Sequence, residues 1–474
     1  MAKMFSKNDY FQCQLIVLCG ILCMLLIPFI FVRAFAIMLL GMLIYTHERQ
    51  LKMLVPASPG FLFWFGNVLS YIVGGFGFAI LADAWDDFGI RYLNDALFYL
   101  GIGLSCYVVG MWLGGVLKKQ NTPINVFMDL KFSHVSIISI SSVFLLTVLL
   151  GGTGDSEMDV KSSYYNIVIG SFQSIENIPL ILLSIYLLQK HPKWWLVGIL
   201  FCSKFVIAIS GMSVGYGRNK LIFALLSISL TWLALHYWYG IKISNSAKLI
   251  ILCLPFVVII YFGIASTYRH SVKFDAYSSI SERQEFLRES INSASSSNNF
   301  VIDSLTQFCE RLVQAHGLEL LGMAETGYIE YYGWTMNDLE QAIFVYIPKI
   351  WYKNKGNGLG SDIMVYYGFT EYNHVPPTIL ADSFRRSGLF GVVIVYFVLG
   401  FVATTITIYF NNHWGSFGPL LALYVALSST YFLSFDVMDI YTFYVYRIVS
   451  SGLVIYVLLR ITGFLPKGTL RKSC

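Results

Sequence analysis

Basic residues at three places in this chain have the type and spacing that phosphate binding needs. The segment Gly-Tyr-Gly-Arg-Asn-Lys places Arg218 and Lys220 beside two glycines at the start of an apolar run. Helix N-termini carry unpaired N–H groups and a partial positive charge, and they attract anions. Arg269 and the pair Arg385 and Arg386 also border apolar runs, and a guanidinium can hold two phosphate oxygens at once. The sequence therefore predicts a site for an anionic lipid headgroup, with solvated boundary charges as the alternative.

Aromatic and basic residues alternate in one polar stretch before the last apolar runs. Lys349, Trp351, Tyr352, Lys355 and Tyr367 lie there among glycines. Sugar rings offer an apolar face for stacking and hydroxyls for polar neighbours, which favours a glycan-binding surface. The alternative is an aromatic belt at a membrane interface.

The composition places the chain in the membrane. Of its 474 residues, 56% are hydrophobic and only 12% are charged, whereas soluble domains carry about a quarter charged residues. The eight cysteines show neither a disulfide framework nor the spacing of metal ligands, so we expect no metal.

Twelve apolar stretches reach the roughly 17–25 residues that a membrane-spanning helix needs. Lysine and arginine are concentrated in the short loops on the side of the two termini, which makes that side cytoplasmic. We therefore predict an all-α polytopic membrane protein of about twelve transmembrane helices. The predicted spans are 12–28, 30–46, 61–81, 96–117, 134–152, 167–189, 194–211, 219–238, 247–267, 387–410, 417–435 and 440–460.

These spans divide the chain into three parts. Residues 1–267 hold nine spans, residues 268–386 form one large loop on the outer, periplasmic side, and residues 387–474 hold three spans and a cytoplasmic tail. The spacing of apolar residues between Val301 and Val313 predicts an amphipathic helix in the loop. Ser281 with Gln284 predicts a helix start; another is predicted at Thr335, for a helix ending at Pro348.

Two motifs resemble the O-antigen and oligosaccharide repeat-unit polymerases of the Wzy type. One is the run Ile-Pro-Lys-Ile-Trp-Tyr-Lys-Asn-Lys that ends at Lys355, followed by Asp382 and a Gly-x-x-Gly start of the next span at Gly388. The other is the Gly217-Arg218 turn, and the large loop before the last three spans agrees as well. The sequence has Lys349 where the family commonly has arginine, and Asp382 where it commonly has glutamate.

The resemblance implies a GT-C-like fold and a metal-independent, inverting glycosyltransferase without a cofactor, in the bacterial inner membrane. It would polymerise undecaprenyl-pyrophosphate-linked repeat units for O-antigen, capsule or exopolysaccharide. A chain-length regulator is a possible partner, and nucleic acid is not. The arginines would stabilise the departing pyrophosphate. For the base that accepts the acceptor proton, we expect Asp382 ahead of His374 and Glu325. The alternative for Asp382 is a helix cap or a partner of Arg385 and Arg386.

Two other functions fit parts of this pattern. An O-antigen ligase shares the topology and the donor but transfers the glycan to lipid A core. A flippase or transporter would also have about twelve spans, but such proteins often show two repeated halves, and we find none in the sequence. Near the last span, Asp436 and Asp439 are possible partners of Arg447, which we interpret as structural.

Overall fold

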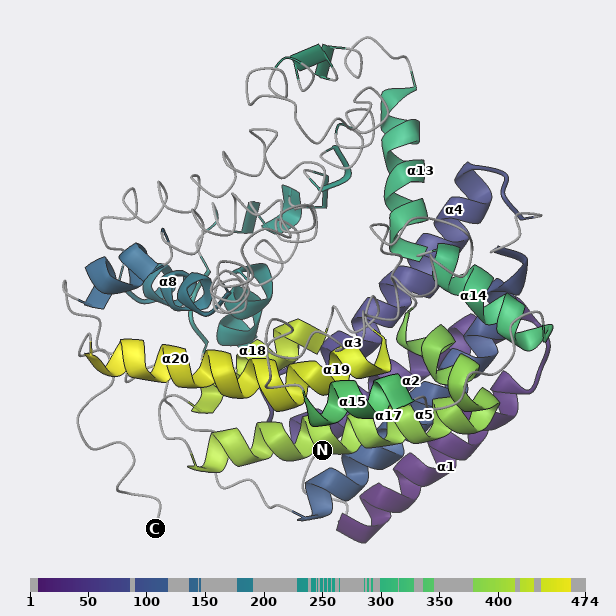
Figure 1. The fold of residues 1–474 in the computed structure, drawn as a ribbon, viewed down its shortest axis with the longest axis horizontal. Coiled ribbons are helices and arrows are strands. Elements are labelled where there is room, and N and C mark those ends of the chain that lie inside the picture. Colours follow the sequence, from purple (N-terminus) through teal and green to yellow (C-terminus); the bar gives the residue numbers. More distant parts are fainter. Residues whose placement is uncertain are drawn as a thin grey trace.

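All regular structure in the described part of the chain is helical. The computed structural model describes residues 7–85, 90–117, 136–143, 177–190, 228–237, 240–243, 299–313, 315–327, 336–344, 378–413, 418–429 and 436–461, with short pieces between 145 and 292 (Figure 1). Four stretches in this part are long and apolar enough to cross a membrane: Ile30–Gln50, Pro59–Leu81, Ile90–Val116 and Ile379–Asn412. The chain is therefore a helical membrane protein.

The first two predicted spans form a helical hairpin. Helix α1 (Lys7–Leu25) and helix α2 (Ile30–Gln50) are joined by a short turn at Pro28, at the boundary of the predicted spans 12–28 and 30–46. The Arg33 side chain closes the turn, because its Nε donates to the carbonyl oxygen of Leu25 at 3.2 Å.

The third predicted span is one continuous helix, here called the rod, with a π-helical stretch in its middle. It consists of α3 (Pro59–Asn67), the π-helix η1 (Val68–Gly74) and α4 (Gly75–Leu81). A proline suits the first helical position because its missing N–H needs no partner there. Glu48 of α2 caps this start, and its Oε1 accepts the N–H of Gly60 at 2.7 Å.

The bundle is held together by close contact between α5 (Leu93–Leu117) and α17 (Ile379–His413). A side-chain carbon at Gly110 would meet the carbonyl oxygen of Phe397, and one at Gly400 would meet that of Tyr107. Small residues let membrane helices approach at backbone distance. The glycines on both helices therefore explain why these two elements, far apart in sequence, are neighbours.

The last two predicted spans coincide with the final helices. Helix α18 (Gly418–Ser428) packs on α17, and α19 (Val437–Thr442), the π-helix η5 (Phe443–Arg447) and α20 (Ile448–Ile461) follow one another without a break. In Figure 1, α20 and the long part of α17 both run across the view.

Shorter helices lie within other predicted spans. Helix α8 (Asn177–Lys190) and helical stretches at 136–143 and 228–237 fall inside three of them. The predicted span 194–211 lies outside the described residues. The total of twelve spans therefore stays a prediction.

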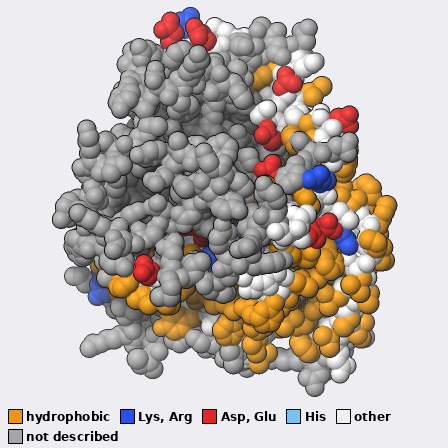
Figure 2. All heavy atoms as spheres, turned by 45° about the vertical axis from the view of Figure 1, so that its right-hand side comes forward, with side chains coloured by type: hydrophobic (Ala, Val, Ile, Leu, Met, Phe, Trp, Pro, Cys, Tyr) orange, Lys and Arg blue, Asp and Glu red, His pale blue; other side chains and the backbone are white. Residues whose placement is uncertain are grey.

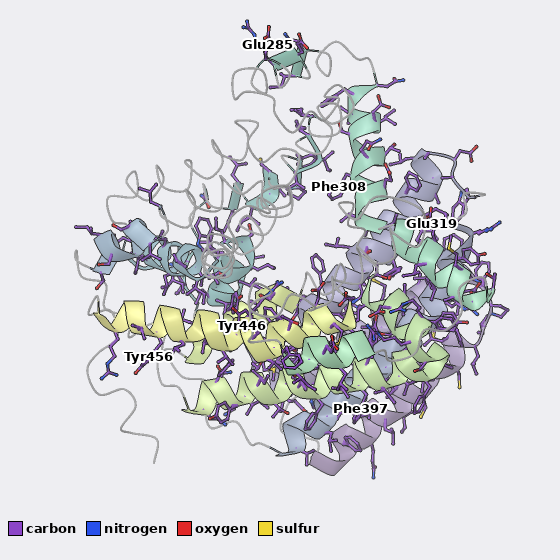
Figure 3. The ribbon with its side chains drawn as sticks, viewed as in Figure 1. Glu285, Phe308, Glu319, Phe397, Tyr446 and Tyr456 are labelled. Carbon is purple, nitrogen blue, oxygen red and sulfur yellow. The ribbon has the colours of Figure 1, made fainter. Side chains whose placement is uncertain are left out.

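Residues 268–386, which the sequence predicts to be one long loop, contain helices. Helix α13 (Phe300–Val313) confirms the predicted amphipathic helix, and α14 (Ala315–Glu325) follows it directly. Helix α15 (Met336–Ile343) starts where the sequence predicts and ends before Pro348. The described positions near Glu285 are helical, and Figure 3 shows Glu285 at the far end of the view from Phe397 of α17.

Helix α13 packs against η1 and α4, and α14, which continues from it at an angle, packs against α17. In Figure 1, α13 rises steeply beside α4. Its Leu312 carbonyl oxygen accepts the hydroxyl of Ser70 at 2.6 Å, in the middle of the rod. Gly74 and Gly77 of the rod provide the space, because added side chains there would meet Leu312 and Cys309. Sequence periodicity predicts the helix, whereas the glycines of another segment determine where it lies.

Apolar side chains gather on one broad face of the molecule, with acidic and basic side chains along its edge (Figure 2). Ile16 and Leu26 of α1 are each 71% exposed, and Phe31 and Met42 of α2 and Ile80 of α4 are also well exposed. Large apolar patches on a protein surface mark contact with another protein or with a membrane. This face is where the helices would meet lipid.

Candidate functional site

The first turns of α17 carry a buried cluster of charged residues. Asp382, Arg385 and Arg386 stand three and four positions apart, so they share one face of the helix. Arg385 donates to Asp382 Oδ1 from Nε at 3.2 Å and from Nη2 at 2.7 Å, and Arg386 Nε donates to Oδ2 at 3.0 Å. Asp382 is 0%, Arg385 4% and Arg386 2% exposed.

A fourth donor joins this cluster to another helix. The backbone N–H of Val437, the first residue of α19, donates to Asp382 Oδ2 at 3.0 Å. Each carboxylate oxygen therefore accepts two hydrogen bonds, which is about its full capacity. Asp382 fixes the direction of both guanidinium groups and holds the starts of α17 and α19 together.

A break in α17 separates the charged turns from the long apolar part. Ser387 and Gly388 have non-helical backbone angles, and Gly388 has φ +58° and ψ −146°. This region is essentially restricted to glycine. A side-chain carbon at Gly391 would meet the carbonyl oxygen of Ser383, so the two parts of α17 pack closely at the break.

The residue just before α17 helps to determine where this helix starts. Thr378 precedes the helix, and its Oγ1 accepts the N–H of Ala381 at 3.3 Å, as expected of a threonine cap. The helix begins at Ile379, within the stretch expected to belong to the loop, and the expected span start at 387 coincides with the break.

A second carboxyl group lies beside the cluster. Asp436 is 2% exposed and caps α19, with its Oδ1 accepting the N–H of Asp439 at 2.6 Å. Burial raises the pKa of the Asp436 carboxyl to about 7, and the negative charges of Asp439 and Asp382 act in the same direction. The hydrogen bond from Asp439 and the positive charge of Arg386 oppose them.

A smaller network at the same end of the bundle includes Glu325. Tyr99 of α5 donates to Glu325 Oε1 at 2.8 Å, and the Tyr99 ring lies 4.5 Å from the ring of Phe384 in α17. Burial and the charge of Asp95 raise the pKa of Glu325, while the Tyr99 hydroxyl and Arg33 lower it. Glu325 is thus close to the first turns of α17 but belongs to a different hydrogen-bonded group.

Arg33 ties this network to the hairpin turn. Its Nη1 donates to the carbonyl oxygen of Asn94 at 2.9 Å and lies 3.5 Å from Asp95 Oδ1. The first turns of α2, α5 and α17 and the end of α14 therefore meet at one end of the bundle. Among the described residues, no three His, Cys, Asp or Glu side chains are grouped as a metal ion would require.

Some of the predicted site residues come together and others lie outside the description. Asp382, Arg385 and Arg386 form one cluster, and Glu325 lies near it. For Asp382 the structure shows the alternative considered from the sequence, a carboxylate paired with both arginines. The residues that lie outside the described ranges are Arg218, Lys220, Arg269, Lys349, Trp351, Tyr352, Lys355, Tyr367 and His374.

The sequence does not place Asp436 at this site. It offers Asp436 and Asp439 as partners of Arg447, and the structure adds that the charges of Asp382 and Arg386 act on Asp436. The only signal was an Asp-x-x-Asp pattern before an apolar run, which indicates a helix cap.

No family model, curated protein or solved structure matches this chain.

Proposed function

We propose that this protein is a glycosyltransferase that polymerises lipid-pyrophosphate-linked oligosaccharide repeat units at the outer face of the bacterial inner membrane. The observation that supports it is a pair of buried arginines, Arg385 and Arg386, oriented by one carboxylate at the end of an apolar helical bundle. The resemblance of the two sequence motifs to Wzy-type polymerases supplies the reaction.

The chemistry of such a transfer fits two oriented guanidinium groups. When the growing glycan leaves its lipid pyrophosphate, negative charge develops on the leaving group. Donors already aimed at that position stabilise the charge without further reorganisation. In this proposal Arg218, Lys220 and Arg269 complete the pyrophosphate site, and Lys349, Lys355 and the aromatic residues Trp351, Tyr352 and Tyr367 contact the sugars.

The proposed topology has twelve spans, cytoplasmic termini and the loop 268–386 on the periplasmic side. The starts of α2, α5 and α17 lie at one bundle end, as Arg33, Asn94, Tyr99 and Phe384 show by their contacts. The topology derived from the basic residues puts these three starts on the outer side. The arginine cluster would then lie where a lipid pyrophosphate is available.

A gene deletion with complementation tests the function. Without the gene, we expect surface glycan to shorten to single repeat units, and the wild-type gene to restore the ladder of chain lengths. The variant Arg386→Lys keeps the charge but loses the planar guanidinium, and we expect it to restore few long chains. Loss of all ligated glycan in the deletion strain would instead indicate a ligase, and an unchanged ladder would reject both enzymes.

A further inference from the structure

The two buried carboxyl groups at the arginine cluster have different surroundings. Asp382 accepts hydrogen bonds from Arg385, Arg386 and Val437, on both of its oxygens. A general base needs a lone pair that can face the substrate hydroxyl. In this arrangement Asp382 directs its oxygens to the protein and acts as a positioning residue.

Asp436 lies one residue before the N–H group that Asp382 binds. It is almost fully buried, and the N–H of Asp439 holds its carboxyl group in place. We propose that Asp436 is the carboxylate that accepts the proton of the acceptor hydroxyl, next to the arginines that receive the pyrophosphate. This proposal rests on the proposed function and replaces Asp382 as the expected base.

The charges around Asp436 suit that role. Its pKa of about 7 results first from burial, with Asp439 on its own helix and Asp382 on α17 raising it and Arg386 on α17 lowering it. The other packed elements carry Glu340 on α15 and Arg447 on η5. A base works best when its pKa is near the working pH, because it is then ionised yet still binds a proton well.

Two carboxyl groups with different environments and different tasks are a recurring arrangement in enzymes. Both are buried, but Asp382 is hydrogen-bonded to two cations, whereas Asp436 is hydrogen-bonded to a backbone N–H and lies near the charges of Asp439 and Asp382. The acceptor oxygen forms a bond to the anomeric carbon, and the bond from that carbon to the phosphate oxygen breaks. The hydroxyl proton passes to Asp436, and the lipid pyrophosphate leaves with the bonding electrons beside Arg385 and Arg386.

The test uses full-length protein in proteoliposomes, with lipid-linked repeat units extracted from the deletion strain as substrate. The variant Asp436→Asn keeps a good helix cap but cannot accept a proton. We expect the wild-type rate to rise with pH through neutrality. In Asp436→Asn we expect this rise to disappear and the rate to fall by roughly 100-fold or more, the usual contribution of a positioned base.

Two further variants make the result specific. In Asp439→Asn, one of the charges that raise the pKa of Asp436 is lost, so the rise in rate should move to lower pH. The exposed Asp303 on α13 lies outside the site, and Asp303→Asn should keep both the rate and its pH dependence. An infrared titration should show a protonated carboxyl band that is lost near neutrality in the wild type and is absent from Asp436→Asn.

Specific results would overturn the proposal. One is an Asp436→Asn protein that keeps the wild-type rate and pH dependence, which would leave Asp436 as a helix cap only. Another is an Asp439→Asn protein whose rate rises at the wild-type pH. Wild-type protein that does not lengthen the glycan at all would reject the proposed function together with this inference. Polymerisation with unchanged variants would reject the inference alone.

Discussion

The Asp382 carboxylate accepts the backbone N–H of Val437 at 3.0 Å, across 55 positions of sequence. This bond connects the first turn of α17 with the first residue of α19 while the same carboxylate holds Arg385 and Arg386. One completely buried side chain therefore contacts both guanidinium groups and the start of α19.

Replacing Asp382 should destabilise the protein strongly. Asp382→Ala removes a completely buried carboxylate that pairs with both Arg385 and Arg386, and removing one member of a buried ion pair costs roughly 3–5 kcal/mol. We expect a clear fall in the thermal unfolding midpoint in detergent. Asp303→Asn, which changes an exposed carboxylate, is the control and should have little effect. An Asp382→Ala protein as stable as the wild type would show that the arginines are satisfied without Asp382.

Gly388 should not tolerate a side chain. Its backbone angles, φ +58° and ψ −146°, are essentially restricted to glycine, and other residues pay roughly 1–3 kcal/mol there. Gly388→Ala should lower stability by about that amount and reduce polymer length in cells, because the break sets the direction of the arginine-bearing turns. At Gly20 of α1 an added carbon meets nothing within 4 Å, so Gly20→Ala is the matched control. Equal stability of the two variants would contradict the argument.

The sequence predicts the helices well where the signal is local. Apolar length predicts α2 and α5, and periodicity predicts α13. The sequence places the start of α17 eight residues late, because 379–386 contains Asp382 and two arginines and does not resemble a membrane span. Its helicity depends on the Thr378 cap and on side-chain pairs three and four residues apart.

The site could be predicted only in part, for a related reason. The pairing of Asp382 with Arg385 and Arg386 follows from helical spacing, and the sequence offers it as an alternative. The environment of Asp436 depends on Asp382, and that of Glu325 on Tyr99, 226 positions away. Such contacts arise when separate helices pack, and one sequence contains no local signal for them.

The stability of the protein should depend on pH through Glu325. Burial raises the pKa of Glu325 above its ordinary value of 4.5. Because the folded form binds its proton more tightly than the unfolded form, this group favours folding at low pH. That contribution is lost as the pH rises from 4.5 through the pKa of the folded state. Glu325→Gln keeps an acceptor for Tyr99 but does not ionise.

The measurement is the difference in thermal unfolding midpoint between Glu325→Gln and wild type across that range. We expect the variant to gain stability relative to the wild type as the pH rises, and the effect to be small because Glu325 is exposed and solvent screens its charge. A difference that is constant with pH would show that Glu325 has the same pKa in both states.

Arg218, which is assigned to the pyrophosphate site from the sequence alone, gives the most direct test of that site. Arg218→Ala should abolish long polymer while the protein remains in the membrane, because a cation that stabilises the leaving group is lost. The measurement is the chain-length ladder on a gel, with membrane content of the protein checked by immunoblot. Arg218→Lys keeps the charge but not the planar fork and should give an intermediate ladder. A normal ladder from Arg218→Ala would remove this residue from the site, and the arginines at the start of α17 would then have to bind the phosphate without it.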